Sequence, residues 1–359
     1  MRVKLEDVCE RGTSSLMQKD IVDKNGKYPV YGASGRIGSM ETYQQEHQTV
    51  AVVKDGAGIG RTMLLPEKSS VIGTMQYLIP KNCIESEYLY YVVKYMHLEK
   101  YFSGATIPHI YFRDYKTEEF NLHDKTEQRE IVSTLKRIEA IISNRQEQLT
   151  KLDELVKARF VEMFGTYPDN PFGWNTGKIQ DVVSNVRYGS SRPAVEGGKY
   201  PYLRMNNITY AGELDLTDTK RIDVPDSELD KCTVQRGDVL FNRTNSKELV
   251  GKTCVYNRDD MMVLAGFVIR VRVNERILPE FLVAFLNTAF SKQMLLRMCK
   301  TAIGQANINA KEMQNIGLYI PPIALQEQFV DLKKQTDKSK LLAELFAQSA
   351  CILAENRSK

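Results

Sequence analysis

The segment KLEDV at Lys4–Val8 returns in altered form as KIQDV at Lys178–Val182, and this repetition decides the fold. Further pairs follow in the same order: Tyr28-Pro29 with Tyr200-Pro201, Glu87–Leu89 with Glu280–Leu282, and Glu127-Gln128 with Glu327-Gln328. The separation of the copies widens along the chain, apart from one small step back at the Tyr-Pro pair, and far exceeds the ~20–50 residues of solenoid repeats. The sequence therefore predicts two divergent copies of one domain, which can read two similar but non-identical targets.

The composition is that of a soluble globular protein of 359 residues, long enough for two domains, or two domains and a connector. No apolar run reaches the ~18 residues of a membrane span, and the first residues lack the apolar stretch of a signal peptide. None of the six cysteines forms a Cys-x-x-Cys pair, so we expect reduced cysteines in the cytoplasm. The net charge of +4 and the pI of 8.5 are only mildly basic, so any DNA-binding surface must be local.

The pattern of apolar residues predicts an α+β fold with two mixed domains, each followed by a long helix. We expect the first domain over 1–123, a central helix over 124–164, the second domain over 165–323 and a distal helix over 324–359. Strands are expected at Thr49–Val53, Tyr77–Ile79, Val239–Phe241, Thr253–Tyr256, Val268–Val273 and Leu318–Ile320. Helices over 87–102 and 280–298 occupy matching places in the two domains.

A heptad pattern runs through the central helix without a Pro or Gly. Its apolar positions are Ile131, Leu135, Ile138, Ile142, Leu149, Leu152, Val156 and Met163, and Arg145 and Arg159 complete the register. Asp124 or Thr126 can cap its start. A helix of ~38 residues is ~57 Å long, which is typical of a coiled-coil arm rather than of an average globular helix.

Within the distal segment, the helical pattern over 325–354 is less regular, with Leu342, Leu345 and Ile352 among its apolar positions. If a two-fold axis relates the repeats, the two helices run antiparallel and pair through these positions. The alternative is that each helix packs only on its own domain. The seam of apolar heptad positions on the central helix is too long for a small domain to cover, so this alternative is disfavoured for the central helix. For the distal helix both interpretations stay open.

No segment forms a convincing catalytic constellation. The glycine-rich Asp55–Gly60 follows a strand, but a P-loop needs GxxxxGK[ST], and a dinucleotide fingerprint needs a helix next. Thr62–Pro66 is typical of a strand, so we favour a β-hairpin over a nucleotide or S-adenosylmethionine site. Gly251–Thr253 lacks the upstream glycine of a P-loop, and the four histidines show no partner pattern for a metal or a nucleophile.

Polar loops rich in Asn, Arg and Ser recur at matching places in both halves. Asn and Arg pair bidentately with adenine and guanine edges, and Lys and Arg contact phosphates. The candidate DNA-binding residues in these loops are Arg36, Lys54, Arg61, Arg187, Arg192, Arg204, Asn206, Asn207, Asn242, Arg243, Thr244, Asn245 and Lys247. Turn formation alone explains any one loop, but recurrence in both halves favours a shared DNA-binding edge.

Several segments resemble the specificity subunit of a type I restriction–modification enzyme. They are the domain openings Val3–Val8 and Trp174–Val182, the segments Tyr28–Gly35, Lys54–Gly58, Gly104–Ile110 and Gly304–Asn309, and the turn Ile320–Gln328. The resemblance covers essentially the whole chain, and the order of the segments, the duplication and the long helices make it specific. It adds His109 and Gln305 to the candidate DNA-binding residues.

The resemblance implies that each target recognition domain reads one half of a split double-stranded DNA sequence. The two helices are expected to form an antiparallel spacer, with the apolar seam also docking two modification subunits. Those subunits carry S-adenosylmethionine, and restriction subunits carry ATP and Mg²⁺, so this chain is expected to bind no cofactor or metal and to be non-catalytic. The alternatives are a coiled-coil scaffold or silent specificity cassette that reads no DNA, and a DNA methyltransferase that uses the Gly56–Gly60 loop.

Overall fold

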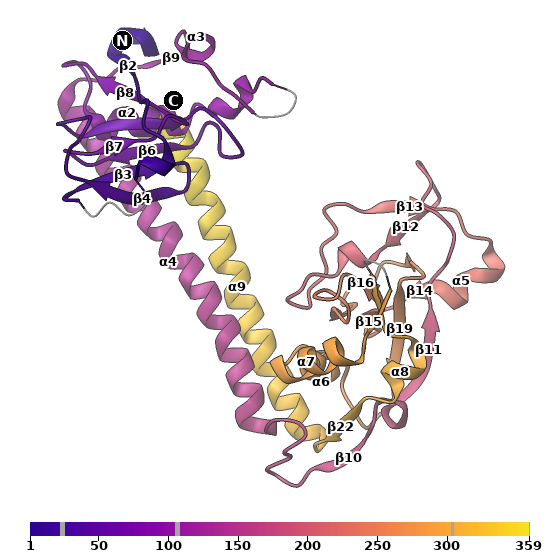
Figure 1. Ribbon diagram of the computed structural model, residues 1–359. Coiled ribbons are helices and arrows are strands. Elements are labelled where there is room, and N and C mark those ends of the chain that lie inside the picture. Colours follow the sequence, from indigo (N-terminus) through magenta and orange to yellow (C-terminus); the bar gives the residue numbers. More distant parts are fainter. Residues whose placement is uncertain (22–25, 105–107, 303–304, 359) are drawn as a thin grey trace. The chain divides into compact units, whose positions relative to one another are not determined.

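The computed structural model describes residues 1–21, 26–104, 108–302 and 305–358 (Figure 1). The side chains within 300–302 and 343–358 lie outside this description. The chain divides into two compact units, one of Met1–Gln148 with Leu342–Lys359 and one of Leu149–Leu341. The boundary between the units therefore falls inside both long helices, α4 (Lys125–Phe164) and α9 (Ile323–Ser358).

The first unit contains sheets with the strand orders β2-β8-β5-β6, β4-β3-β7 and β1-β9. Its elements before α4 are β1 (Arg2–Lys4), α1 (Leu5–Val8), β2 (Cys9–Thr13), η1 (Gln18–Asp20), β3 (Tyr28–Gly32), β4 (Gly35–Met40), β5 (Thr49–Val53), β6 (Thr62–Leu65), β7 (Ser70–Val71), β8 (Met75–Pro80), α2 (Ser86–Lys94), η2 (Leu98–Tyr101), α3 (Phe112–Tyr115) and β9 (Glu119–Asn121). Every residue of β5 is buried, because alternate side chains enter two clusters, Val50 and Val52 with α2, and Ala51 and Val53 with β7. Burial on both faces explains why this strand is uniformly apolar.

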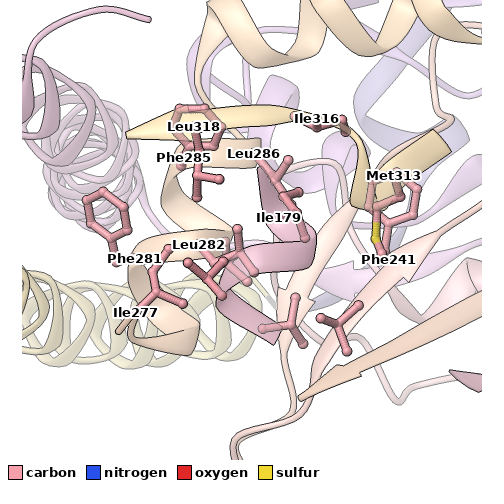
Figure 2. Packing of buried hydrophobic residues seen from close by; sticks show 14 of the residues in the cluster. Ile179, Phe241, Ile277, Phe281, Leu282, Phe285, Leu286, Met313, Ile316 and Leu318 are labelled. Atoms are coloured by element: carbon pink, nitrogen blue, oxygen red, sulfur yellow. The ribbon is translucent and has the colours of Figure 1, made fainter. Parts of the chain in front are cut away.

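The second unit contains sheets with the orders β11-β19-β15-β17, β13-β12-β18-β14, β10-β22 and β16-β21-β20. Its elements between α4 and α9 are β10 (Asn175–Lys178), η3 (Ile179–Val182), β11 (Val183–Tyr188), β12 (Tyr200–Leu203), η4 (Met205–Asn207), β13 (Lys220–Ile222), α5 (Asp226–Cys232), β14 (Thr233–Val234), β15 (Val239–Asn242), β16 (Thr244–Asn245), β17 (Thr253–Val255), β18 (Met262–Leu264), β19 (Val268–Val273), α6 (Pro279–Leu286), α7 (Ala289–Met298), β20 (Lys300–Ala302), β21 (Gln305–Asn307), α8 (Ala310–Gln314) and β22 (Gly317–Ile320). Figure 2 shows the main core, in which Phe281, Leu282 and Phe285 of α6 pack with Ile179 and Leu318.

Two sheets of the first unit have counterparts in the second. The strand order β2-β8-β5-β6 matches β11-β19-β15-β17, and the order β4-β3-β7 matches β13-β12-β18. In the second of these matches, β3 pairs parallel with β7, and β12 pairs parallel with β18. The openings also match, because Asp7 accepts from the Lys4 N–H at 2.9 Å and Asp181 accepts from the Lys178 N–H at 2.8 Å. The predicted duplication is therefore confirmed at the level of individual hydrogen bonds.

The position of a buried glutamine shows that the predicted match of Gln128 with Gln328 needs correction. Gln128 is fully buried, and its amide oxygen accepts from the Glu85 N–H at 2.8 Å. In the second unit, the fully buried Gln326 accepts from the Leu278 N–H at 2.8 Å, whereas Gln328 is exposed. The amide nitrogens donate to carbonyl oxygens of Cys83 and His123 in the first unit, and of Arg276 and Pro321 in the second. Gln128 therefore corresponds to Gln326, and the match with Gln328 was wrong because residue identity alone ignores which side chain faces the core.

The central helix forms as its heptad pattern predicts. It spans 40 residues, and the Asp124 carboxylate caps it by accepting from the Thr126 N–H at 2.8 Å and the Glu127 N–H at 2.9 Å. Every predicted seam position from Ile131 to Met163 is buried or half-buried. The ends of the seam also pack on the domains, because Leu135 enters the core of the first unit and Val156 contacts that of the second.

Within the second unit the two long helices run antiparallel. Phe160 of α4 contacts Phe329 of α9 with ring centroids 5.2 Å apart, and the earlier Asp153 pairs with the later Lys340. The predicted positions on α9 are not supported in the same way. Leu342 is 51% exposed, and the side chains of Leu345 and Ile352 lie outside the described residues.

Two shorter helices differ from the prediction. The helix expected over 87–102 stops at Lys94, because His97 takes a left-handed backbone conformation with φ 53°. The helix expected over 280–298 is divided into α6 and α7, because the Thr288 hydroxyl caps a new helix by accepting from the Ser291 N–H at 3.2 Å. The predicted strands are confirmed. Among the described residues, no helix is long and apolar enough to cross a membrane.

Replacement of the buried glutamine tests the corrected repeat. We expect Gln326→Ala to lower the free energy of unfolding by about 2–3 kcal/mol, because it leaves a buried N–H and buried carbonyl groups without partners. The matched control Gln328→Ala, on the exposed face of the same helix, should change it by less than about 0.5 kcal/mol. Chemical denaturation of the full chain measures both values, and equal effects would contradict the assignment.

Candidate nucleic-acid interface

The glycine-rich segment Asp55–Gly60 joins β5 to β6, which pair antiparallel, so the predicted β-hairpin is confirmed. Gly60 has φ +81°, and an added Cβ would lie 2.7 Å from the Glu99 backbone nitrogen. The equivalent loop between β15 and β17 ends at Gly251 with φ +80°. Both loops close alike. The Val53 N–H donates to the Arg61 carbonyl and the Val53 carbonyl accepts from the Gly60 N–H, just as the Asn242 N–H donates to the Lys252 carbonyl and the Asn242 carbonyl accepts from the Gly251 N–H.

A second loop meets each of these loops, and we call the two meeting points loop junctions. The first junction comprises residues 54–56 and 108–110, and the second comprises residues 243–245 and 306–308. The Ile110 N–H donates to the Lys54 carbonyl at 2.9 Å, and the Ile308 N–H donates to the Arg243 carbonyl at 2.9 Å. The backbone of the two junctions is therefore held in the same way.

The side chains of the first junction form a small polar network. His109 Nδ1 lies 2.7 Å from the Asp55 carboxylate, and Lys54 Nζ lies 3.1 Å from the same carboxylate. The His109 ring also stacks on Tyr111, with centroids 6.3 Å apart and an interplanar angle of 21°. When the ring is neutral, donation from Nδ1 to the carboxylate leaves Nε2 of the ring as a hydrogen-bond acceptor.

The side chains of the second junction form a different network. Asn307 donates to the Thr244 hydroxyl at 3.2 Å and accepts from an Arg243 Nη at 3.4 Å. The Arg243 guanidinium lies over the Tyr188 ring, 4.9 Å from its centroid. The Tyr188 hydroxyl in turn accepts from the Ala310 N–H at 2.9 Å, so ring and guanidinium are both held in place. Arginine supplies donors only, in a planar fork that suits guanine edges and phosphates.

Exposed basic and aromatic side chains lie close to the junctions in the chain. Arg187 and Lys247 are exposed in the second unit, and the large exposed aromatic side chains there include Tyr188 and Phe267. Phe267 is next to the junction, because its carbonyl accepts from the Arg243 N–H at 3.0 Å. This mixture of cations, planar rings and hydrogen-bonding groups can contact both phosphates and base edges.

Comparison with protein families identifies the chain. The model of the type I restriction modification DNA specificity domain matches residues 1–153 and 171–346. The chain belongs to this family. The two matched stretches correspond to the two copies of the repeat, so the chain holds two specificity domains.

Curated relatives include specificity subunits at low identity. The EcoKI specificity subunit of Escherichia coli is 28% identical over 156 residues, which cover 42% of this chain and 33% of the relative. The putative MjaX specificity subunit of Methanocaldococcus jannaschii is 25% identical over 171 residues, covering 46% of this chain and 40% of the relative. These matches span only about a third to two fifths of the relatives' length.

Solved structures share the fold over the whole chain. The S subunit of a type I restriction–modification system from M. genitalium is 16% identical, with a TM-score of 0.57, and the match covers 100% of this chain and 95% of that chain. A chain from a structure of type I restriction–modification complex assembly gives a TM-score of 0.60 at 16% identity, covering 100% and 96%. The predicted fold class, two mixed domains with two long helices, is therefore confirmed.

Several candidate cations of the specificity domains are already engaged within the chain. Arg192 donates to Glu228 at 2.7 Å and Arg204 donates to Asp218 at 2.9 Å, and these hydrogen bonds lower the pKa of each carboxyl group. Arg61 donates to the Ala33 carbonyl at 2.7 Å. These arginines hold loops together in this structure, so they are weaker candidates for DNA contact than Arg187 or Lys247.

The bond made by Arg61 also has a counterpart in the second specificity domain. The buried Lys252, which takes the place of Arg61, donates to the Met205 carbonyl at 2.9 Å. Burial lowers the pKa of Lys252 and, together with the Lys252 charge, lowers that of Lys292 to about 8. In both repeats, therefore, a basic side chain of the hairpin loop donates to a backbone carbonyl of the neighbouring loop and holds the two loops together.

Burial removes other predicted residues from the interface. The side chain of Asn207 is 2% exposed and is consumed by hydrogen bonds to the Arg204 N–H and the Asp215 carbonyl. Asn242 is fully buried. Thr244 is only 6% exposed and serves the second junction indirectly, because its hydroxyl accepts from Asn307. Of the remaining candidates, Arg36, Asn206 and Gln305 are exposed, and Lys54, His109 and Asn245 are half-buried. A polar residue in a loop can be buried and form hydrogen bonds inside the domain, and its residue type alone does not show whether it does.

Three participants were missing from the predicted set, namely Asp55, Tyr188 and Asn307. Each lies inside a segment that the sequence had marked: Asp55 and Tyr188 adjoin a chosen residue, and Asn307 follows Gln305 by two positions. Alignment of the two repeats on Ile110 and Ile308 places Asn307 opposite His109 and provides the signal that could have found it. Among the described residues, no group of three His, Cys, Asp or Glu side chains could hold a metal ion.

The buried Asn242 generates a stability prediction. Neither its amide nitrogen nor its amide oxygen has a hydrogen-bond partner in the described structure, and Val53 occupies the same position in the first unit. We expect Asn242→Val to raise the free energy of unfolding by about 1–2 kcal/mol, because it removes an unpaired buried amide. Denaturant unfolding of the full chain measures this change. The matched control Val53→Asn should lower stability, and a loss on Asn242→Val would show that a bound water satisfies the amide.

Proposed function

We propose that the chain is the DNA sequence-specificity subunit of a type I restriction–modification complex, in which each domain reads one half of a bipartite target. The loop junctions support this proposal most directly. The same backbone hydrogen bonds hold Lys54, Asp55 and His109 in one unit and Arg243, Thr244 and Asn307 in the other. One scaffold with two sets of side chains is suited to reading two different half-sites.

The long helices are proposed to set the spacing of the half-sites and to dock two modification subunits. A continuous α-helix is stiff and rises ~1.5 Å per residue, so its length fixes the distance between the two domains. That distance in turn fixes the number of base pairs between the half-sites. Methyl transfer requires a base to leave the duplex, so the partner subunits must supply S-adenosylmethionine and the catalytic pocket. Restriction subunits would supply ATP, Mg²⁺ and cleavage, which leaves this chain as a non-catalytic, cytoplasmic DNA-binding component.

Truncation of one junction arginine tests the division into two readers. With the full chain assembled on its modification subunits, we expect Arg243→Ala to weaken discrimination in one half-site by about 1–3 kcal/mol and to leave the other half-site unchanged. The measurement is methylation or binding on duplex libraries in which each half-site is varied separately. An equal loss in both halves would contradict the two-reader model, and no preference in the unaltered complex would favour a scaffold or silent cassette.

The exposed Lys247 on the same loop is the matched control for Arg243. Loss of a phosphate contact should weaken binding evenly across sequences and reduce the dependence of log K on log salt by about 1. Lys247→Ala should therefore alter affinity without altering either half-site.

Lengthening the helices tests the spacer. Seven residues inserted into α4 after Gln148 and into α9 after Leu341, where the compact units divide, preserve the heptad register. The insertion adds ~10 Å, so we expect the preferred spacer to lengthen by about three base pairs with unchanged half-sites. Methylation of duplexes with graded spacers measures this change. An unaltered spacer preference would rule out the role of the helices in spacing.

A further inference from the structure

We propose that three side-chain positions of each loop junction determine which base its domain prefers, and that these sets can be exchanged between the domains. The positions are 54, 55 and 109 in the first unit and 243, 244 and 307 in the second. This inference rests on the proposed function, because it names the residues through which each domain distinguishes bases.

Matching backbone hydrogen bonds join each junction to the segments around it. The Lys54 N–H donates to the Thr74 carbonyl and the Arg243 N–H donates to the Phe267 carbonyl, both at 3.0 Å. Asp55 is bridged antiparallel to His109, and the matching Thr244 to Asn307. Side chains moved from one junction to the other therefore start from the same backbone positions.

The side chains at these positions offer opposite hydrogen-bonding groups. In the first junction, His109 Nδ1 lies 2.7 Å from the Asp55 carboxylate, so Nε2 of the neutral ring is an acceptor, which suits the amino group of adenine or cytosine. In the second junction, Arg243 presents donors, which suit O6 and N7 of guanine. The first domain is therefore expected to prefer a base with an exposed amino group at this position, and the second to prefer guanine.

Arg243 is held for this role by its neighbours. The Tyr188 ring lies against the guanidinium, and Asn307 and the Gly266 carbonyl accept from its Nη atoms at 3.4 and 3.5 Å. These last contacts are long, so they orient the fork without consuming its donor strength. Tyr188 is accordingly a positioning residue, which acts on the base through Arg243.

Exchange of the three side chains tests the proposal. The full chain carrying Arg243→Lys, Thr244→Asp and Asn307→His, assembled with its modification subunits, is assayed on duplexes with a randomised second half-site. We expect the preference at one or two adjacent base pairs to move from guanine to adenine or cytosine by about 5- to 150-fold, the range that one bidentate contact provides. The first half-site should stay unchanged. An unaltered second half-site at full affinity would overturn the proposal, because the networks would then only maintain the loops.

Single substitutions keep the test decisive if the triple variant does not fold. Arg243→Lys preserves the charge and removes the planar fork, so it should reduce the guanine preference while leaving the salt dependence of binding unchanged. Tyr188→Phe should retain that preference and Tyr188→Leu should reduce it, because the ring supports the guanidinium. Guanine preference retained in both Arg243→Lys and Tyr188→Leu would exclude this role for the junction.

The two proposals fail in different ways. If the unaltered complex shows no sequence preference, the proposed function is wrong. If it reads both half-sites and the exchange of the three side chains changes neither, DNA reading stands and the assignment of these positions is wrong.

Discussion

The structure depends on one interaction that occurs in both repeats, the buried glutamine amide near the start of each long helix. Gln128 and Gln326 each bind a backbone N–H where the domain helix begins and carbonyl groups of two neighbouring turns. A buried amide with all its partners strongly restricts the geometry, because any displacement leaves polar groups unpaired. Each long helix is thereby fixed to its own domain, which any spacing role of the helices requires.

The repeats show how one backbone can carry two chemistries. The loop junctions share their main-chain hydrogen bonds, whereas a carboxylate and an imidazole in one are replaced by a hydroxyl, an amide and a stacked guanidinium in the other. Because the main chain supplies the positions, side chains at the surface can vary without loss of the fold. By the same separation, interior differences such as Val53 against Asn242 are expected to affect stability rather than recognition.

Local sequence predicted the elements whose signal is local. The heptad spacing was sufficient to predict the central helix, because it indicates burial along one face. The apolar run was sufficient to predict β5, because it indicates burial of the whole strand. The helix over 280–298 was not resolved into α6 and α7, because the cap at Thr288 competes with helix continuation and its outcome depends on the packing of both parts. The candidate site was found only in part: Arg243 and His109 were chosen, but Asn207 turned out to be buried and Asn307 was missed.

The sequence by itself determined the duplication, the fold class, the long central helix and the family, because each rests on order and periodicity that survive in the chain. Only the tertiary structure decided which glutamine is equivalent to Gln128, which polar residues face outward, and which side chains meet at the loop junctions. Those outcomes depend on contacts between residues far apart in sequence, such as Asp55 with His109 and Arg243 with Tyr188. The physical reason is that burial and hydrogen-bond partners are properties of the packed chain, and the residue type sets only which partners can be accepted.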